Sequence, residues 1–428
     1  MGHWADRMRV AGACAALVVL ATSAALAETD VRLKITTEGY TKISIGFAEP
    51  GAGVESSLRP NYDRFIAIVR QDLDLSGYFE IVESIRDARP NAAVTATVAR
   101  QKGDLSFEAT LSDVASATTI FKHKYTSMGE DVAQAAHSAA EEIIFALTGR
   151  HGLAKTRVAF VAGERGSSHL YAAYLDGSTP ERLTEGAGIV MSPSWSQDGT
   201  RLAYVSYAEG RPAIYVMAAA TSRAVRFASY EGLNGTPAWS PDGRSLAVTL
   251  AKDGNPEIYI LALDGSSEKR VTFYSGIDCS PSWAPNGLEL AFTSDRAGRP
   301  QVFVTDIEGL NVRQITTEGP YNTSPAWSPD GGLIAYVSRV DGKFQICTID
   351  PFGVKSRILT GEGNNEDPCW SADGMHIVFS STGDGDSGIY IVSRDGGHKR
   401  KVVGGMVRPR NPAWAPPPGY GQQPPPEG

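Results

Sequence analysis

A few residues in this 428-residue chain have types and spacings that suit catalysis or ion binding. The segment Gly385-Asp386-Ser387-Gly388 resembles part of a serine-protease motif, but its place at a predicted hairpin tip favours a turn. Asp384 and Asp386 offer carboxylates to a calcium ion, although the further oxygen ligands of a loop site do not follow. The sequence contains no G-x-S-x-G nucleophile elbow and no Walker loop. These motifs therefore give little support to an enzyme.

The histidines and cysteines are spaced too widely to predict a metal site or a disulfide framework. Six of the seven histidines follow residue 27, and no two of them form the i,i+4 pair that presents zinc ligands on a helix. The three cysteines beyond that residue, Cys279, Cys347 and Cys369, lie far apart and outside any C-x-x-C motif. We expect them to be small buried side chains, and we expect neither a metal nor a cofactor.

Composition and charge restrict the class of protein. Hydrophobic residues make up 42% and charged residues 21% of the chain, as in ordinary globular proteins, and the formal net charge is −8. That charge makes nucleic acid and anionic lipid poor candidate partners. Residues 1–27 combine Arg7 and Arg9 with an Ala-rich apolar stretch and the cleavage pattern Ala25-Leu26-Ala27, which is typical of a secretory signal peptide. A membrane anchor is the alternative, but the apolar stretch is short.

The strongest pattern in the sequence is a repeat of about 44 residues. The motif Pro-x-Trp, followed after two residues by Asp-Gly or Asn-Gly, recurs at five tryptophans and in part at a sixth, namely Trp195, Trp239, Trp283, Trp327, Trp370 and Trp414. Successive spacings are 44, 44, 44, 43 and 44 residues, and each repeat contains four strand-like segments. This period is typical of β-propeller blades, whereas an ordinary sandwich would not keep it. We expect the tryptophans to pack between neighbouring blades.

The two ends of the repeat region predict how the ring closes. A hairpin of the same type, Val158–Val161 with Leu170–Leu175, comes before the first motif and lacks a Pro-x-Trp strand. At the other end, Pro412-Ala413-Trp414 has no hairpin after it. The simplest arrangement is a mainly β fold with a six-bladed propeller, in which the C-terminal strand completes the first blade.

The remaining segments predict a small α/β domain and a tail. Residues 28–150 lack the repeat and carry strand-like alternation together with two helical stripes, at 61–75 and 130–147. The predicted organisation is therefore a signal peptide at 1–27, an N-terminal α/β domain at 28–150, the propeller at 151–416 and a disordered Pro-rich tail at 417–428.

The residues just before each repeated proline are candidates for partner binding. If the Pro-x-Trp strand is the innermost strand of each blade, these residues line the mouth of the central channel. They are mostly small and polar, which predicts a polar cup that accepts a loop or a peptide. The candidates are Met191, Ser192, Asn234, Gly235, Thr236, Asp278, Cys279, Ser280, Asn322, Thr323, Ser324, Glu366, Asp367, Arg410 and Asn411. Alternatively, these residues only provide hydrogen bonds to the backbone groups at the strand ends.

Two segments of the chain, together with this architecture, resemble the TolB family. The segment 292–302, Phe-Thr-Ser-Asp-Arg-Ala-Gly-Arg-Pro-Gln-Val, is similar to the TolB sequence of the same blade, and residues 68–79 resemble its N-terminal domain. The resemblance extends to about Trp414, with departures at Leu233, Cys279 and Ser280.

The resemblance implies a function without catalysis. TolB proteins are periplasmic components of the Tol-Pal system, which supports outer-membrane integrity and invagination during cell division. The family binds the peptidoglycan-associated lipoprotein Pal through the propeller mouth and TolA through its mature N-terminus. That N-terminus is either packed between the domains or released, and Pal biases the choice. In this chain it corresponds to Glu28, Thr29, Asp30, Val31, Arg32, Leu33, Lys34 and Ile35. The alternative function is an exported propeller hydrolase or lyase that uses Asp278 or Glu366 in the channel.

Overall fold

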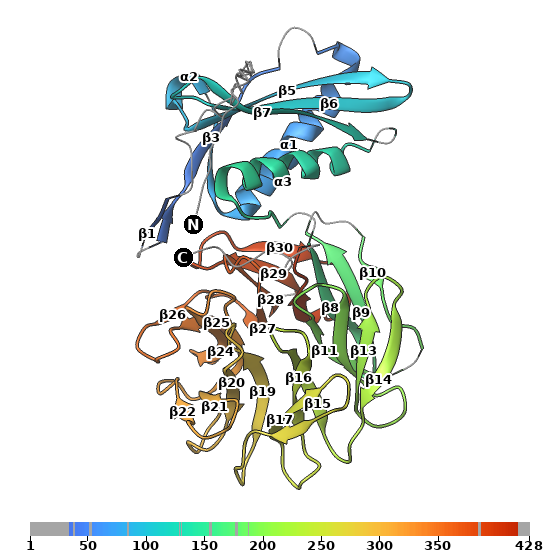
Figure 1. The fold of residues 1–428 in the computed structure, drawn as a ribbon, viewed down its shortest axis with the longest axis vertical. Helices are drawn as coiled ribbons and strands as arrows, with labels where there is room; N and C mark the ends of the chain where they lie inside the picture. Colours follow the sequence, from blue (N-terminus) through green and yellow to red (C-terminus); the bar gives the residue numbers. More distant parts are fainter. Residues whose placement is uncertain are drawn as a thin grey trace, which may run out of the picture.

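The computed structural model describes residues 34–36, 39–50, 54–83, 85–127, 129, 131–153, 156–175, 179–186, 188–383 and 387–417. The expected signal peptide, the candidate residues 28–33, the carboxylates at 384 and 386, and residues 418–428 lie outside these ranges. The described chain forms an α/β region followed by a ring of six four-stranded sheets (Figure 1). Among the described residues, no helix combines the length and the apolar character that crossing a membrane requires.

The α/β region is a five-stranded sheet with two long helices. Its elements are β1 (Lys34–Thr36), β2 (Gly39–Thr41), β3 (Ile43–Phe47), η1 (Ser56–Leu58), α1 (Arg59–Ser76), β4 (Phe79–Val82), α2 (Ile85–Ala88), β5 (Ala92–Gln101), β6 (Asp104–Asp113), β7 (Thr118–Ser127) and α3 (Ala133–Thr148). The sheet order is β4-β3-β5-β6-β7, and β1 pairs separately with β2. The helices share one buried core with the sheet, in which the rings of Phe65 and Phe107 stack 4.5 Å apart.

The ends of the two long helices follow from local sequence. α1 has a proline in its first turn and stops at Gly77, whose φ of 78° is left-handed. α3 stops in the same way at Gly149, but it begins at Ala133 rather than at residue 130. Just before the helix, the Asp131 carboxylate accepts the Ala133 N–H at 3.1 Å and so satisfies an N–H group of the first turn. The four-residue helix α2 was not predicted, because it is too short to show periodicity.

The ring consists of six blades, each a four-stranded antiparallel sheet. Blade 1 contains β8 (Arg157–Glu164), β9 (Ser167–Tyr174), β10 (Glu181–Arg182) and β31 (Arg410–Trp414). Blade 2 contains β11 (Val190–Trp195), β12 (Arg201–Ser206), β13 (Ala213–Ala218) and β14 (Arg223–Ala228). Blade 3 contains β15 (Asn234–Trp239), β16 (Ser245–Leu250), β17 (Glu257–Ala262) and β18 (Glu268–Arg270).

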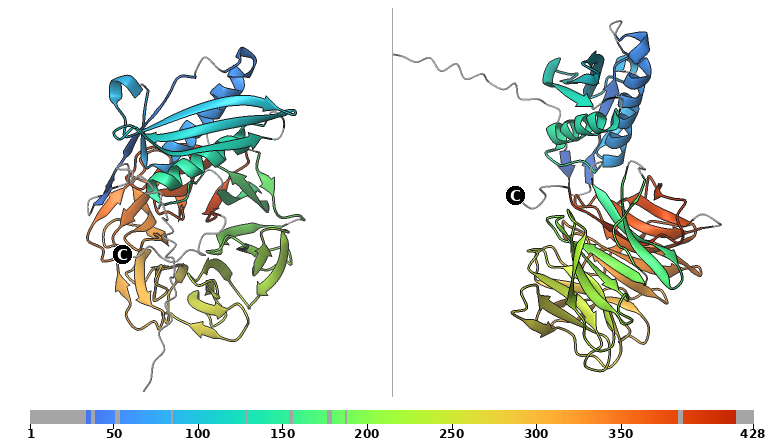
Figure 2. Two further views of the ribbon diagram at one scale, coloured as in Figure 1. Left: turned by 45° about the horizontal axis from the view of Figure 1, so that its top comes forward. Right: turned by 90° about the vertical axis from the view of Figure 1, so that its right-hand side faces the viewer.

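The remaining three blades repeat this order. Blade 4 contains β19 (Asp278–Trp283), β20 (Glu289–Ser294), β21 (Gln301–Asp306) and β22 (Arg313–Gln314). Blade 5 contains β23 (Asn322–Trp327), β24 (Ile334–Val340), β25 (Lys343–Ile349) and β26 (Ser356–Ile358). Blade 6 contains β27 (Asn364–Trp370), β28 (His376–Thr382), β29 (Ser387–Ser393) and β30 (Arg400–Val403). The left view of Figure 2 shows the blades surrounding a central opening.

In blades 2 to 6 the four residues after the tryptophan, Ser-Pro-Asp-Gly in blades 3 and 5 and close variants in the others, form the turn after the innermost strand. In blade 3 the Ser240 hydroxyl donates to Asp242 Oδ1 at 2.6 Å, and the same oxygen accepts the Arg244 N–H at 3.0 Å. Gly243 then takes a left-handed φ of 66°. Equivalent serine–aspartate bonds occur in blades 2, 5 and 6. The motif thus encodes a tight reversal from the first to the second strand.

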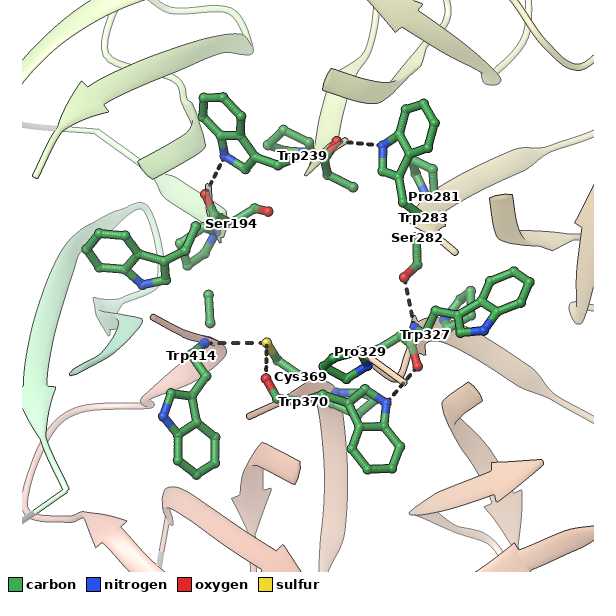
Figure 3. A pocket seen from close by; sticks show the side chains of 18 of the residues that line it. Ser194, Trp239, Pro281, Ser282, Trp283, Trp327, Pro329, Cys369, Trp370 and Trp414 are labelled. Atoms are coloured by element: carbon green, nitrogen blue, oxygen red, sulfur yellow. Dashed lines mark hydrogen bonds between the residues drawn. The ribbon is translucent and has the colours of Figure 1, made fainter. Parts of the chain in front are cut away.

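The repeated tryptophans join neighbouring blades, as the sequence predicts. Trp239 Nε1 donates to Ser194 O at 2.9 Å, Trp283 Nε1 to Ala238 O at 3.1 Å and Trp370 Nε1 to Ala326 O at 2.9 Å, each across one blade boundary. Figure 3 shows these indoles arranged around the channel with their rings directed into the wall. Burying one such ring contributes about 2–3 kcal/mol.

The C-terminal strand closes the ring, which confirms the predicted six-bladed arrangement. β31 pairs antiparallel with β8, with Trp414 opposite Val158 and Ala413 opposite Ala159. Trp414 Nε1 also donates to Thr156 Oγ1 at 2.7 Å. Two segments that lie some 250 residues apart therefore share one sheet.

The α/β region sits against one end of the ring, beside blade 6 (Figure 2). Tyr78 Oη donates to Asp373 Oδ2 at 3.2 Å, and Asp373 belongs to the turn that follows β27. Leu75 at the end of α1 packs in a buried cluster with Leu153 and Val402. The α/β region therefore contacts the end at which the innermost strands finish. Among the described residues, these contacts leave uncovered the end of the ring at which the innermost strands begin.

Truncation tests the closure of the ring. We expect a chain that ends at Arg410 to lose its propeller in one cooperative transition at a lower melting midpoint, because β8 loses its partner and Trp414 leaves the core. Circular dichroism on heating measures the midpoint. A chain that ends at Pro417 keeps the strand and is the matched control. Equal midpoints for the two truncations would refute the closure.

Candidate functional site

The central channel is a cavity of about 330 Å³ that all six innermost strands line. Its wall consists mainly of the repeated Pro-x-Trp-Ser segments, together with the residue before each proline (Figure 3). Among the side chains that line it, only Asp367 and Cys369 can ionise. The wall is therefore built from small hydroxyl, methyl and pyrrolidine groups.

The residue before each repeated proline has a left-handed backbone. The six residues and their φ angles are Ser192 (52°), Thr236 (42°), Ser280 (55°), Ser324 (53°), Asp367 (58°) and Asn411 (47°). Such values are uncommon outside glycine, most of all for a β-branched residue such as Thr236. All six residues line the channel, together with the strand residues that follow them. Strained positions that persist in a fold concentrate at functional sites.

A β-bulge explains this conformation. In every innermost strand the pairing shifts between the residue before the left-handed position and the residue after the proline, for example between Gly235 and Ala238. Proline has no N–H and tolerates an unpaired bulge position, and its ring disfavours a right-handed helical conformation in the preceding residue. The sequence Pro-x-Trp therefore determines the shape of the channel mouth six times.

The left-handed residues also connect neighbouring blades. The backbone N–H of Ser280 donates to Thr249 Oγ1 at 3.2 Å, and that of Ser324 donates to Thr293 Oγ1 at 3.1 Å. At the boundary between blades 6 and 1, the Asn411 N–H donates to Asp367 Oδ2 at 3.1 Å. These hydrogen bonds therefore join the mouth across three blade boundaries, between blades 3 and 4, 4 and 5, and 6 and 1.

The residues predicted for the mouth occupy three different environments. Asn234, Asp278 and Asn322 are fully buried, and their side chains hold loops rather than face the channel. Thr236, Ser280, Ser324 and Asp367 line the channel. Met191, Cys279, Thr323 and Arg410 are half-buried, Gly235 is buried and Glu366 is exposed. The buried position of Asp278 also removes it as the catalytic group of a channel enzyme.

The prediction missed the apolar residues that surround the mouth. Five large hydrophobic side chains, between 37% and 73% exposed, lie in the loops that lead into the innermost strands of blades 3, 4, 5 and 1. We call them the rim, and they are Leu233, Phe273, Ile277, Tyr321 and Val407. The predicted cup is therefore lined by small polar and apolar groups and carries larger apolar side chains in the loops at its edge. Single apolar residues in loops carry no periodic signal, so only their placement around one opening exposes the pattern.

The N-terminal candidates are only partly described. Glu28, Thr29, Asp30, Val31, Arg32 and Leu33 lie outside the described residues, whereas Lys34 and Ile35 belong to β1 and pair with Thr41 and Tyr40 of β2. No cluster of three metal-ligating side chains occurs in the part of the chain that the structure describes. Cys279, Cys347 and Cys369 are free thiols. Burial raises the pKa of all three, to about 12 for Cys347, which keeps them protonated at neutral pH.

These observations define a six-bladed β-propeller with an attached α/β region, and comparisons with known proteins agree. The family model described as the TolB beta propeller domain matches residues 145–417. The match covers more than half of the chain, and the chain therefore belongs to the TolB propeller family.

Individual relatives agree with this assignment. The crystal structure of TolB from Acinetobacter baumannii is similar with a TM-score of 0.76 and 29% identity, over 90% of this chain and 99% of that one. The Tol-Pal system protein TolB of Methylococcus capsulatus is 34% identical over 207 residues, which are 43% of this chain and 47% of that protein. That of Desulfosudis oleivorans is 36% identical over 114 residues, 27% and 26% of the two chains. The chain thus spans about half or less of the length of these curated relatives. None of these names states a catalysed reaction.

Asp367 makes the stability of the mouth depend on pH. Burial raises the pKa of its carboxyl, and hydrogen bonds from the Asn411 N–H and the Ser380 hydroxyl only partly oppose this. The native state then holds the proton more tightly than the unfolded state, so stability falls as pH rises from about 3.9 through the raised native value.

Replacing this carboxyl tests the effect. We expect Asp367→Asn to increase the free energy of unfolding by roughly 1 kcal/mol at pH 7 and to have little effect near pH 4, because the amide keeps the acceptor without the charge. Urea unfolding at the two pH values measures this. Asp341→Asn, at an exposed left-handed position with φ 48°, is the control. An equal change in the free energy of unfolding at both pH values would contradict a raised pKa of Asp367.

Proposed function

We propose that this chain is a periplasmic scaffold of the Tol-Pal system that binds protein partners and catalyses no reaction. One observation carries the proposal: the loops that lead into the innermost strands of blades 3, 4, 5 and 1 carry five exposed large hydrophobic side chains, and the same strands line a channel of small side chains. A solvent-exposed group of large hydrophobic side chains around a concavity is typical of a protein-docking surface.

The chemistry of the mouth fits a protein segment better than a small substrate. The rim offers apolar anchors on blades 3, 4, 5 and 1, and the exposed charges of Glu366 and Arg408 lie at the boundary of blades 6 and 1. An apolar group with a charged border matches the anatomy of protein interfaces. The narrow floor of small side chains accepts the tip of a loop.

Pal is the partner that we assign to this mouth. Support comes from membership of the TolB family and from curated relatives that carry the name Tol-Pal system protein TolB. In this proposal the rim contacts Pal directly, and Thr236, Ser280, Ser324 and Asp367 contact the inserted loop. The buried Asn234, Asp278 and Asn322 act by holding the loops in place.

TolA is the partner that we assign to the segment Glu28–Ile35. The last two residues of this segment, Lys34 and Ile35, belong to β1, which lies at the edge of the α/β region nearest the ring (Figure 1). Lys42, just after β2, is near enough to blade 6 to help Ser393 lower the pKa of Asp395. In this proposal the strand leaves this position when a partner binds to the ring. Binding of Pal then changes the affinity for TolA, and binding of TolA changes the affinity for Pal. Together the contacts would link the outer membrane to the inner membrane during constriction.

A charge placed in the rim tests the docking of Pal. We expect Ile277→Arg to raise the dissociation constant for purified Pal at least tenfold, because an arginine at an apolar anchor must be desolvated on binding. Isothermal titration calorimetry measures the constant. Val225→Arg adds the same charge at an exposed valine of β14, far from the mouth. Equal affinity of both variants and the unmodified chain would exclude the rim.

Removal of residues 28–33 tests the assignment to TolA. We expect this deletion to abolish measurable binding of TolA, because it removes the proposed contact segment. We expect the affinity for Pal to stay equal or rise, because the segment no longer docks between the domains in competition with the released state that binding of Pal favours. Surface plasmon resonance with each partner measures both. A synthetic peptide of residues 28–35 should compete with the full chain for TolA. Unchanged TolA affinity after the deletion would contradict the assignment.

A further inference from the structure

The segment Phe292–Val302 is distinctive in sequence, yet the proposed contacts leave it without a role. It runs from the end of β20 through a hairpin loop into β21 of blade 4. Two loops that carry rim residues flank this hairpin at the uncovered end of the ring. They are loop 273–277, with Phe273 and Ile277, and loop 317–321, with Tyr321.

Arg296 in this segment is inserted beneath the first rim loop. Its Nη2 donates to Asp278 Oδ2 at 2.6 Å, and its Nε donates to Ser294 Oγ at 2.9 Å. The guanidinium carbon also lies 5.1 Å from the ring centre of Tyr274, 5.4 Å from that of Phe292 and 5.2 Å from that of Phe303. The side chain is 21% exposed, so these interactions act in a largely desolvated place.

The Asp278 carboxylate depends on this arginine. Its side chain has no exposure at all, and its Oδ1 has no hydrogen-bond partner among the described residues. Burial raises the pKa of this carboxyl, whereas Ser294 and Arg296 act in the opposite direction. A buried charge that loses its partner is strongly destabilising.

Blades 5 and 6 carry an asparagine, instead of an aspartate, at the position equivalent to Asp278. At the position of Asp278, blade 5 has Asn322, whose Nδ2 donates to Gln301 Oε1 and to Glu318 O, both at 2.7 Å. Blade 6 has Asn365, which donates to Gln345 Oε1 at 2.9 Å and to Glu362 O at 2.8 Å. In those blades one asparagine therefore holds the loop that leads into its own strand.

In blade 4 the loop is held from outside its own strand. Asn255 Nδ2 donates to Tyr274 O at 2.6 Å and to Gly276 O at 2.8 Å, and Asp295 Oδ1 accepts the Ile277 N–H at 2.9 Å. Arg296 completes this support by stacking on Tyr274 and pairing with Asp278. Asp295 and Arg296 thus hold the loop together with two residues of blade 3, Asn255 and Glu257, whose Oε1 accepts the Tyr274 N–H at 2.7 Å.

The other half of the segment holds the second rim loop. Pro300 O accepts the Asn322 N–H at 3.0 Å, and Gln301 Nε2 donates to Gly319 O at 3.2 Å. Gln301 is fully buried, and its Oε1 accepts bonds from both Asn322 and Thr316. One short segment therefore supports the two loops that carry Phe273, Ile277 and Tyr321.

We infer that Arg296 is a positioning residue for partner docking, which presets the 273–277 part of the rim through its stack on Tyr274 and its ion pair with Asp278. The inference rests on the proposed function for its binding consequence. Its structural consequence, a preset loop in the free protein, is independent of any partner. A preset anchor loop raises affinity because less conformational entropy is lost on binding.

Three variants of the full chain separate positioning from simple charge neutralisation. Arg296→Met removes the stack and the ion pair. Arg296→Met with Asp278→Asn also removes the buried carboxylate and places in blade 4 the residue type that blades 5 and 6 carry. Arg357→Met removes an equal charge from the exposed outer strand β26 and is the control.

Amide hydrogen exchange of the free protein is the first measurement. We expect residues 273–278 to exchange at least tenfold faster in both Arg296 variants than in the control, while the exchange of β20 and β21 is retained in the double variant. The melting midpoint should fall in the single variant and recover in the double variant. If the single variant does not fold, the double variant alone carries the comparison. Unchanged exchange in 273–278, or its full recovery in the double variant, would overturn the inference.

Affinity for Pal is the second measurement. We expect the dissociation constant to rise about tenfold in the double variant, although its melting midpoint is restored. An affinity equal to that of the control, despite a faster exchanging loop, would refute the role in docking. If the unmodified chain does not bind Pal, the proposed function fails, and hydrogen exchange still decides whether Arg296 presets the loop.

Discussion

The pairing of β31 with β8 is the interaction on which the rest of the structure depends. It joins the last strand of the ring to the first, so that all six blades keep two neighbours. The bond from Trp414 to Thr156 and the burial of that indole reinforce the same boundary. A ring that failed to close would expose strand edges and open the channel, because each blade is stable only against its neighbours. Channel, mouth and rim therefore all follow from one non-local contact.

Closure of the ring also brings the six left-handed residues together at the channel mouth. A left-handed residue before a proline is only a bulge in an isolated strand, but six of them around one axis form a continuous mouth. Hydrogen bonds to Thr249, Thr293 and Asp367 join the mouth across three blade boundaries and so constrain its shape before any partner binds. Rigid, small side chains at the centre and larger apolar ones around them suit recognition rather than chemistry.

The two ends of the ring have different tasks. The turn after the innermost strand of blade 6 meets the α/β region through the bond from Tyr78 to Asp373, whereas loops before the innermost strands carry the rim. A scaffold that joins two partners needs two separate surfaces and a connection between them. The propeller supplies this, since every innermost strand runs from one end to the other. This arrangement is the physical basis for the proposed link between Pal and TolA.

Much of the fold was determined by sequence alone. The spacing of the tryptophans predicted the blades, and the unmatched hairpin and Pro-x-Trp strand predicted the closure, because both are periodic or local properties. The site was predicted less well. Thr236, Ser280, Ser324 and Asp367 line the channel as expected, but Asn234, Asp278 and Asn322 are buried. The rim and the role of Arg296 were decided only by tertiary structure, because Leu233, Phe273, Ile277 and Tyr321 come from separate loops that meet only when the blades stand in a ring. No local pattern records which loops become neighbours.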